Sequence, residues 1–247
     1  MNLQEFFKLN PRAAIAFSGG VDSSYLLYAA CKYGAQAKAY YVKSAFQPEF
    51  ELEDAKRLAE NVGADMEIIY EDVLKADEVA ANPKERCYFC KHRIFSRILG
   101  AAAEDGFTTV LDGTNASDDA ADRPGMKALS ELKVLSPLRE CGLTKNDIRA
   151  LSKEAGLFTW DKPAYACLAT RIQTGERITE DKLRAVEESE KFLFGLGFSD
   201  FRVRTADGRA KLQVKKDQME LAVSKRTDII NELGKYFSEV TLDLKAR

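Results

Sequence analysis

A glycine-rich loop between a short apolar segment and a helical segment constrains this chain more than any other feature. Residues 13–17 form an apolar run typical of a buried strand, and residues 22–33 place their apolar side chains on one side of a helix. Between them lies the segment SGGVDSS, residues 18–24. Two glycines let the backbone turn tightly, and the start of a helix offers unpaired N–H groups and a positive dipole end. The loop therefore predicts a phosphate site in the first strand–helix unit.

This loop lacks the spacing and the lysine of a Walker loop, and it resembles the SGGxDS signature of the PP-loop ATP pyrophosphatases. Members of that superfamily split ATP between the α- and β-phosphates, so the resemblance implies transfer of AMP to a substrate oxygen. It also implies that Asp22 helps to hold Mg²⁺, a hard ion that binds carboxylate and phosphate oxygens. An ordinary glycine turn capped by serine is the alternative. The loop residues expected to bind ATP are Ser18, Gly19, Gly20, Asp22, Ser23 and Ser24.

Strands and helices alternate through the first part of the chain. The pattern predicts strands at 13–17, 36–43, 67–70 and 108–113 and helices at 22–33, 49–61, 91–104 and 143–155. Such alternation predicts an α/β fold in which helices cover both faces of a parallel sheet. Ligands bind such sheets beyond the carboxyl ends of the strands.

Two polar pairs follow predicted strands at that edge. Lys43 and Ser44 come after the second strand, and Thr114 and Asn115 come after the fourth. The PP-loop resemblance implies that the first pair lies near the adenosine of ATP and the second near its ribose or α-phosphate. A polar junction between strand and loop explains each pair equally well.

The C-terminal part follows a different pattern. A helix at 179–196, strands at 201–205 and 210–214, a helix at 217–233 and a strand at 237–244 predict a small α+β domain. We therefore expect a PP-loop domain over 1–175 that carries the ATP site. A second domain over 176–247 is expected to bind substrate, to form oligomer contacts, or both.

Composition limits the class of partner. Hydrophobic residues make up 45% of the chain and charged residues 31%, which is typical of a globular protein in water. The net charge of −2 gives no strong electrostatic case for nucleic acid, although basic residues can still cluster locally. No apolar run approaches the roughly 20 residues that span a bilayer, and the N-terminus lacks a secretory signal pattern. Five cysteines in such a chain fit thiols in a reducing cytoplasm rather than a disulfide framework.

Three of the cysteines have surroundings that favour chemistry. Cys87 and Cys90 form a CxxC pair at the entrance to a helix, among basic residues. Positive charge and a helix N-terminus favour the thiolate, which is the form that binds metal or attacks. Cys167 lies far downstream, in an irregular stretch that ends at Arg171.

Three hypotheses account for these cysteines. In the first, Cys87, Cys90 and Cys167 hold a 4Fe–4S cluster and leave one iron without a protein ligand. In the second, Cys167 alone donates sulfur and the CxxC pair serves another purpose. In the third, the pair joins His92 or Cys167 in a structural zinc site, although His92 is close to Cys90 for a shared tetrahedral ion.

Five segments together resemble the LarE family, the sulfur insertases of nickel-pincer cofactor biosynthesis. They occur in the family's order and span nearly the whole chain: AFSGGVDSS, ERCYFCK, DGTNASDDAADRPG, SPLRECGLTKNDIR and DKPAYACLATRI. The resemblance implies an ATP-dependent sulfurtransferase that forms AMP and pyrophosphate. It also implies a substrate, pyridinium-3,5-biscarboxylic acid mononucleotide, whose carboxylates are adenylated and then converted to thiocarboxylates.

The family has two branches that differ in their sulfur source. One gives up the sulfur of a single cysteine at the position of Cys167, and the other holds a cluster on three cysteines. The extra CxxC pair places this chain in the second branch, so we expect Cys87, Cys90 and Cys167 to hold the cluster and deliver sulfur. The resemblance also favours a homo-oligomer, and it leaves the external source of sulfide open.

Several arginines are candidates for binding the substrate. Arg171 follows Cys167, and Arg202 and Arg204 share one face of a predicted strand, a pair that suits a phosphate or carboxylates. Arg123, in the acidic loop of the third family segment, is a further candidate. Solvent-facing arginines are the alternative for the strand pair. Glu190 is a weaker candidate for contact with substrate or metal, and a solvated helix face is the favoured interpretation for it.

Other functions fit parts of the pattern. A tRNA thiolase uses similar cysteines, but the near-neutral charge and the lack of a basic tail argue against it. An amide synthetase would not need the three cysteines. A non-catalytic module that binds ATP or AMP would release no pyrophosphate when an acid substrate is added, which separates it from all the enzymes.

Overall fold

The computed structural model describes residues 1–118 and 124–247, and these fall into two compact units. The first comprises residues 1–73 and 85–162, and the second comprises residues 74–84 and 163–247. The expected boundary near residue 175 therefore lies inside the second unit. The reason is that the short segment 74–84 pairs with the chain around that position. The Gly175 N–H donates to the Asn82 carbonyl at 2.8 Å, and the Asn82 side chain donates to the Gln173 carbonyl at 2.9 Å.

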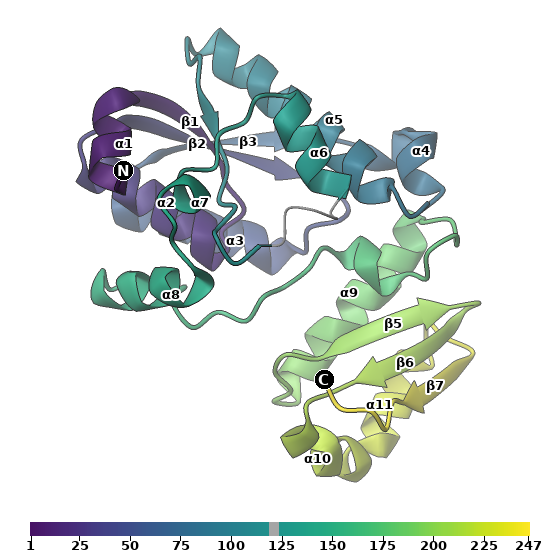
Figure 1. The fold of residues 1–247 in the computed structure, drawn as a ribbon. Coiled ribbons are helices and arrows are strands. Elements are labelled where there is room, and N and C mark those ends of the chain that lie inside the picture. The colour runs from purple at the N-terminus through teal and green to yellow at the C-terminus, as the bar shows by residue number, and fades with distance from the viewer. Residues whose placement is uncertain (119–123) are drawn as a thin grey trace. The chain divides into compact units, whose positions relative to one another are not determined.

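The predicted parallel sheet is confirmed in the first unit (Figure 1). Its strands run in the order β3-β2-β1-β4, and every paired neighbour is parallel. The fourth strand is shorter than expected, with two residues, because only that stretch pairs with β1. The strand bounds are β1 (Arg12–Ala16), β2 (Gln36–Lys43), β3 (Asp65–Tyr70) and β4 (Val110–Leu111).

Helices cover both faces of this sheet, as the alternating pattern predicted. Ile15 and Tyr41 pack in one core with residues of α1, α2, α3, α7 and α8. Ala14 and Tyr40, the neighbours of those residues in the strands, pack in the other core with residues of α5 and α6. Side chains alternate across a strand, so a strand buried on both faces is apolar throughout. The bounds are α1 (Leu3–Leu9), α2 (Val21–Lys32), α3 (Glu49–Val62), α5 (Arg86–Glu104), α6 (Pro124–Glu131), α7 (Pro137–Glu140) and α8 (Lys145–Glu154).

The second unit contains the small three-stranded sheet that the C-terminal pattern predicted. Strands β5 and β6 form an antiparallel hairpin through Asp207 and Gly208, both of which have positive φ, as a two-residue hairpin turn requires. Strand β7 pairs with β6 in parallel. The expected helix over 217–233 is two helices, because Lys225 (φ −95°, ψ 11°) leaves helical geometry between them. The bounds are α4 (Asp77–Ala80), α9 (Glu180–Gly195), β5 (Arg202–Ala206), β6 (Arg209–Gln213), α10 (Met219–Ser224), α11 (Arg226–Leu233) and β7 (Glu239–Leu242).

Three short 3₁₀ helices complete the regular structure of the described residues: Val73–Lys75, Leu168–Arg171 and Lys216–Gln218. The second of them follows Cys167 directly. Among residues 1–118 and 124–247, none of the helices is both long and apolar enough to cross a membrane.

Candidate active site

The glycine-rich loop joins β1 to α2 at the carboxyl edge of the parallel sheet, where it was expected. Gly19 has φ +68°, and a Cβ atom there would lie 3.0 Å from the Cβ of Ala55 in α3. A larger residue at this position would therefore be strained in its backbone and crowded by α3. Within the loop, the Gly20 N–H donates to the Ser18 hydroxyl at 3.4 Å, and the Ser18 and Ser23 hydroxyl oxygens lie 3.0 Å apart.

This loop forms one wall of a cavity of about 510 Å³ in the first unit. A cavity of this size suits a small-molecule ligand. The other walls come from the segment that follows β4, from the first turns of α5, and from the start of α6. The lining residues include Ser18, Gly20, Asp22, Ser23, Cys87, Lys91, Phe95, Asp112, Gly113, Thr114, Asp118 and Gly125.

The structure brings about half of the expected ATP-binding residues to this cavity. Its lining contains Ser18, Gly20, Asp22, Ser23 and Thr114. The others belong to the same edge of the sheet but make contacts of their own. The ammonium of Lys43 donates to the Gln47 carbonyl at 2.6 Å, and the Ser44 hydroxyl donates to the Gln47 side chain at 2.8 Å.

The two carboxylate oxygens of Asp22 differ in their hydrogen bonding. Its Oδ2 accepts a hydrogen bond of 2.7 Å from the ammonium of Lys145, at the start of α8. Its Oδ1 is buried and has no hydrogen-bond partner within the described part of the chain. A buried carboxylate oxygen beside a phosphate loop suits Mg²⁺, which usually takes one or two carboxylates together with phosphate oxygens and water. The residues present therefore fit the expected ion.

Two features of this site were not predicted from the sequence: the pairing of Lys145 with Asp22, and the packing of Gly113, a residue already expected near the ribose or α-phosphate. Lys145 lies 123 residues from Asp22 in the chain, so no local spacing signals the pair. Gly113 packs directly on the start of α2, where an added Cβ would lie 2.9 Å from the Ser23 nitrogen. A glycine at the end of a predicted strand was the available signal for the second.

Cys87 and Cys90 both lie in the first turns of α5, which begins earlier than predicted. Cys87 is exposed and lines the cavity, and its sulfur accepts a contact of 3.6 Å from the guanidinium of Arg86. Within the described residues of either unit taken by itself, no three His, Cys, Asp or Glu side chains lie close enough to hold one metal ion. Cys87, Cys90 and His92 of the first unit therefore do not form the zinc site considered above.

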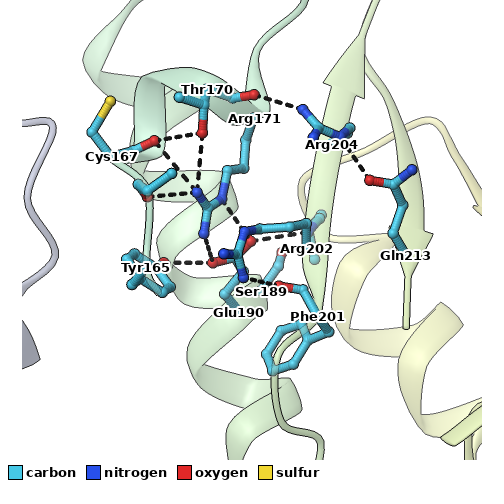
Figure 2. A network of polar contacts seen from close by, with 12 residues as sticks. Tyr165, Cys167, Thr170, Arg171, Ser189, Glu190, Phe201, Arg202, Arg204 and Gln213 are labelled. Atoms are coloured by element: carbon cyan, nitrogen blue, oxygen red, sulfur yellow. Dashed lines mark hydrogen bonds and ion pairs between the residues drawn. The ribbon is translucent and has the colours of Figure 1, made fainter. Parts of the chain in front are cut away.

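Cys167 belongs to the second unit and is partly buried, immediately before the 3₁₀ helix (Figure 2). The structure differs from the expectation for two of its neighbours. Glu190 was expected on a solvated helix face, but it is buried and forms an ion pair with Arg171. Arg171 is also buried, and its guanidinium donates to the Glu190 carboxylate and to the Ala166 carbonyl, the latter at 2.6 Å. Arg171 thus holds the cysteine loop, and binding of substrate by this residue stays a prediction.

The pKa values of three arginines in this unit are shifted by burial and by their charged neighbours. Burial disfavours the charged form of Arg171, but the hydrogen bonds and charge of Glu190 outweigh it and raise the pKa of Arg171. Burial, and then repulsion by Arg171, lowers the pKa of Arg202 and of Arg204.

Arg202 and Arg204 lie in different surroundings although they share a face of β5. Arg202 is buried and donates to the Ala164 carbonyl at 2.7 Å. Arg204 is exposed, donates to the Thr170 carbonyl at 2.8 Å, and lines a cavity of about 560 Å³ in the second unit. Arg209 and Lys211 line the same cavity. The remaining candidate, Arg123, lies outside the described residues.

Known proteins resemble this chain over part of its length and, in other cases, over nearly all of it. Residues 10–121, which contain the glycine-rich loop and the CxxC pair, match the asparagine synthase family. An uncharacterised protein of Synechocystis sp. is 36% identical over 99% of this chain and 92% of its own length. The tRNA-specific 2-thiouridylase MnmA of Thermotoga petrophila is 24% identical over 59% of this chain and 52% of its own length.

A characterised relative covers nearly the whole chain. The pyridinium-3,5-bisthiocarboxylic acid mononucleotide synthase of Lactiplantibacillus plantarum is 34% identical over 94% of this chain and 86% of its own length. The matched span thus extends over both units of the chain. The chain belongs to the LarE family of PP-loop proteins and is an ATP-dependent sulfurtransferase.

Proposed function

We propose that this enzyme adenylates the carboxylates of pyridinium-3,5-biscarboxylic acid mononucleotide and converts them to thiocarboxylates. One observation carries the proposal: Cys87 lines the same cavity as the phosphate loop. An enzyme that sulfurates an activated acid needs a sulfur-handling group beside the site where ATP is cleaved. Similarity to the Lactiplantibacillus plantarum relative, a synthase of the corresponding bisthiocarboxylic acid mononucleotide, supports the same product here.

In the first step, a substrate carboxylate oxygen attacks the α-phosphorus of ATP, and pyrophosphate leaves. The N–H groups at the start of α2 and the hydroxyls of Ser18 and Ser23 bind the phosphates. Asp22 holds Mg²⁺ through its unengaged oxygen, and the ion neutralises charge on the phosphates. The remaining ATP contacts come from Gly19, Gly20, Ser24, Lys43, Ser44, Thr114 and Asn115.

In the second step, a sulfur nucleophile attacks the acyl carbon and AMP leaves. Cys87, Cys90 and Cys167 would hold a 4Fe–4S cluster, which would supply the sulfur for this step. Two observations support this arrangement in the first unit: Cys87 and Cys90 are three residues apart on α5, so they share a helix face, and Cys87 is exposed at the cavity. When bound, such a cluster leaves one iron free to carry the sulfide that is transferred. The alternative is that Cys167 gives up its own sulfur.

The second unit binds the charged groups of the substrate or forms contacts between copies in a homo-oligomer. Arg204 is the candidate supported best, because it is exposed and lines a cavity together with Arg209 and Lys211. Guanidinium groups suit phosphate and carboxylate oxygens. Arg202 and Arg171 contribute by holding the loop that bears Cys167, and Arg123 is a further candidate. The reaction takes place in the cytoplasm, with sulfide supplied by an external donor.

Metal content of the purified protein tests the cluster. Protein purified without oxygen should be brown and contain about four iron and four sulfide per chain. The Cys87→Ala variant should lose both, while a Cys31→Ala variant, which alters a cysteine of α2, should keep them. Wild-type protein that stays colourless after reconstitution with iron and sulfide would contradict the cluster. Cys167 would then be the donor, and loss of the elements of H₂S from the protein after turnover would identify it.

A further inference from the structure

A buried ion pair lies behind the loop that carries Cys167 (Figure 2). The side chains of Arg171 and Glu190 are 0% and 2% exposed. Two parallel hydrogen bonds join them: Arg171 Nε donates to Glu190 Oε1 at 3.0 Å, and Arg171 Nη2 donates to Glu190 Oε2 at 3.0 Å. A guanidinium and a carboxylate joined in this way have a fixed mutual orientation.

Each oxygen of the Glu190 carboxylate accepts two hydrogen bonds. Its Oε1 also accepts the Val203 N–H at 2.9 Å, and its Oε2 also accepts the Tyr165 hydroxyl. An ionised carboxylate accepts about four hydrogen bonds, so this one is saturated. Glu190 therefore connects three segments of the second unit: the cysteine loop, α9 and β5.

The remaining nitrogen of the Arg171 guanidinium, Nη1, binds backbone carbonyls at and beside the cysteine. This nitrogen donates to the Ala166 carbonyl at 2.6 Å and to the Cys167 carbonyl at 3.4 Å. Arg202 adds a hydrogen bond of 2.7 Å to the Ala164 carbonyl. The ring of Tyr165 lies close to both arginines, with guanidinium carbons 4.4 and 5.4 Å from its centroid. Each of these contacts holds the loop from the side of α9 and β5.

Regular structure does not hold this loop, since residues 163–167 belong to no helix or strand. Burial of an ion pair is a poor way to stabilise a fold, because removing two charges from water costs roughly what their attraction returns. The pair does, however, set the position of backbone atoms beside the cysteine. The position of this ion pair beside Cys167 indicates that it orients the sulfur of that residue.

We propose that Glu190 is a positioning residue for sulfur transfer: acting through Arg171, it fixes the backbone at residues 164–167 and thereby the sulfur of Cys167. This inference rests on the proposed function. It assigns Glu190 no contact with substrate and no proton transfer. A displacement of about 1 Å at a reacting group lowers a rate by roughly 100-fold, so the inference predicts a loss of that size when the network is broken.

The test compares Glu190→Gln with the wild type by two readouts. A glutamine has one acceptor oxygen and places an NH₂ group against the donors of Arg171 or Tyr165. The two parallel hydrogen bonds to Arg171, with their full set of acceptors, are therefore lost. In a single turnover at saturating ATP and acid, sulfur transfer should fall roughly 100-fold while release of the first pyrophosphate is unchanged. Amide hydrogen exchange in the segment 163–172 should become faster without a matching change in α9. The second readout does not depend on sulfur transfer.

Val186→Ala is the matched control on the same helix. Val186 is fully buried in α9, and the network does not include it. The variant should lower the melting temperature, as large-to-small changes in a core do. Sulfur transfer and exchange in 163–172 should nevertheless match the wild type at temperatures well below unfolding.

Two results would overturn the inference. One is wild-type sulfur transfer and exchange in Glu190→Gln. The other is an equal loss of pyrophosphate release and sulfur transfer, in proportion to the loss of stability, as expected of a purely structural residue. If Glu190→Gln does not fold, Tyr165→Phe removes one of the four donors and keeps the ion pair, and a selective partial loss of sulfur transfer is then expected. A wild type that releases no pyrophosphate with the acid refutes the proposed function instead, and exchange still reports on the loop.

Discussion

Gly113 sets the distance between two segments of the site at the scale of one residue. An added Cβ would lie 2.9 Å from the Ser23 nitrogen, so Gly113→Ala must push the segment after β4 away from α2. We expect a loss of about 1–3 kcal/mol in stability and weaker binding of ATP, measured by thermal unfolding and calorimetric titration.

Gly100→Ala is the control for that variant. Gly100 lies within α5, and an added Cβ would meet no atom within 4 Å. Because alanine is favoured over glycine in a helix by about 1 kcal/mol, this variant should be more stable and bind ATP normally. A Gly113→Ala protein with wild-type stability and ATP affinity would show that the two segments are free to separate.

Lys145 is expected to interact with bound pyrophosphate as well as with Asp22. Its ammonium lies 2.7 Å from Asp22 Oδ2, beside the phosphate loop. A hydrogen bond to a charged group contributes about 1.5–3 kcal/mol, so Lys145→Met should weaken pyrophosphate binding at least about tenfold. Lys153→Met removes the same charge from the same helix, where the ammonium lies over the Trp160 ring, and should bind pyrophosphate normally. Equal affinities of the two variants for pyrophosphate would show that Lys145 does not contribute to pyrophosphate binding.

Individual residues of the site were predictable only where a local pattern marks them. Gly19 and Gly20 are adjacent in a loop that already resembles a family signature, and Cys87 and Cys90 have a recognisable spacing. Glu190 was misjudged because its partners Tyr165, Arg171 and Val203 are distant in sequence. The pattern of apolar residues along one helix does not reveal an ion pair whose two residues meet only in the folded structure.

At the scale of an element, α8 has an N-terminal cap that ionisation controls. The Thr144 N–H donates to Asp147 Oδ2 at 2.9 Å, and the Thr144 side chain accepts from the Asp147 N–H. Hydrogen bonds from the Thr144 hydroxyl, and then from its backbone N–H, lower the pKa of Asp147 below the ordinary value of 3.8. The stabilisation is therefore fully present above that value and is lost as pH falls through the lower pKa of the folded state.

Asp147→Asn should for this reason lower the melting temperature at neutral pH. The difference from the wild type should begin to shrink as the pH falls below 3.8 and should be lost below the lower pKa of the folded state, where both proteins carry an uncharged side chain. Thermal unfolding at a series of pH values measures it. A difference that stays constant over the series would mean that the charge of Asp147 does not stabilise the helix.

Elements were predictable where periodicity is long and were misplaced where a tertiary contact defines them. The strand–loop–helix unit β1–α2 and the helix α3 fall close to the predicted ranges, since their apolar residues repeat at regular spacing. Strand β4 is shorter than predicted because only Val110 and Leu111 pair with β1. Helix α5 begins at Arg86, earlier than Lys91, so the CxxC pair is helical and not merely adjacent to a helix.

The whole molecule consists of two units whose border could not be read from composition. Residues 74–84 belong to the second unit although they lie between elements of the first. Hydrogen bonds such as that from the Ile178 N–H to the Ala80 carbonyl join this segment to the chain beyond residue 163. Pairing between segments so far apart leaves no trace in a local pattern, whereas the α/β class and the α+β tail both follow from the order of elements.

Identification of the product tests the central claim most directly. Wild-type protein is incubated with ATP, Mg²⁺, sulfide and pyridinium-3,5-biscarboxylic acid mononucleotide, and products are identified by mass spectrometry, with Cys167→Ser as the control. We predict a product in which sulfur replaces a carboxylate oxygen, with one AMP and one pyrophosphate formed for each sulfur added, and no such product from Cys167→Ser. Formation of AMP and pyrophosphate without a sulfur-containing product, or a sulfur product made equally by Cys167→Ser, would contradict the proposal.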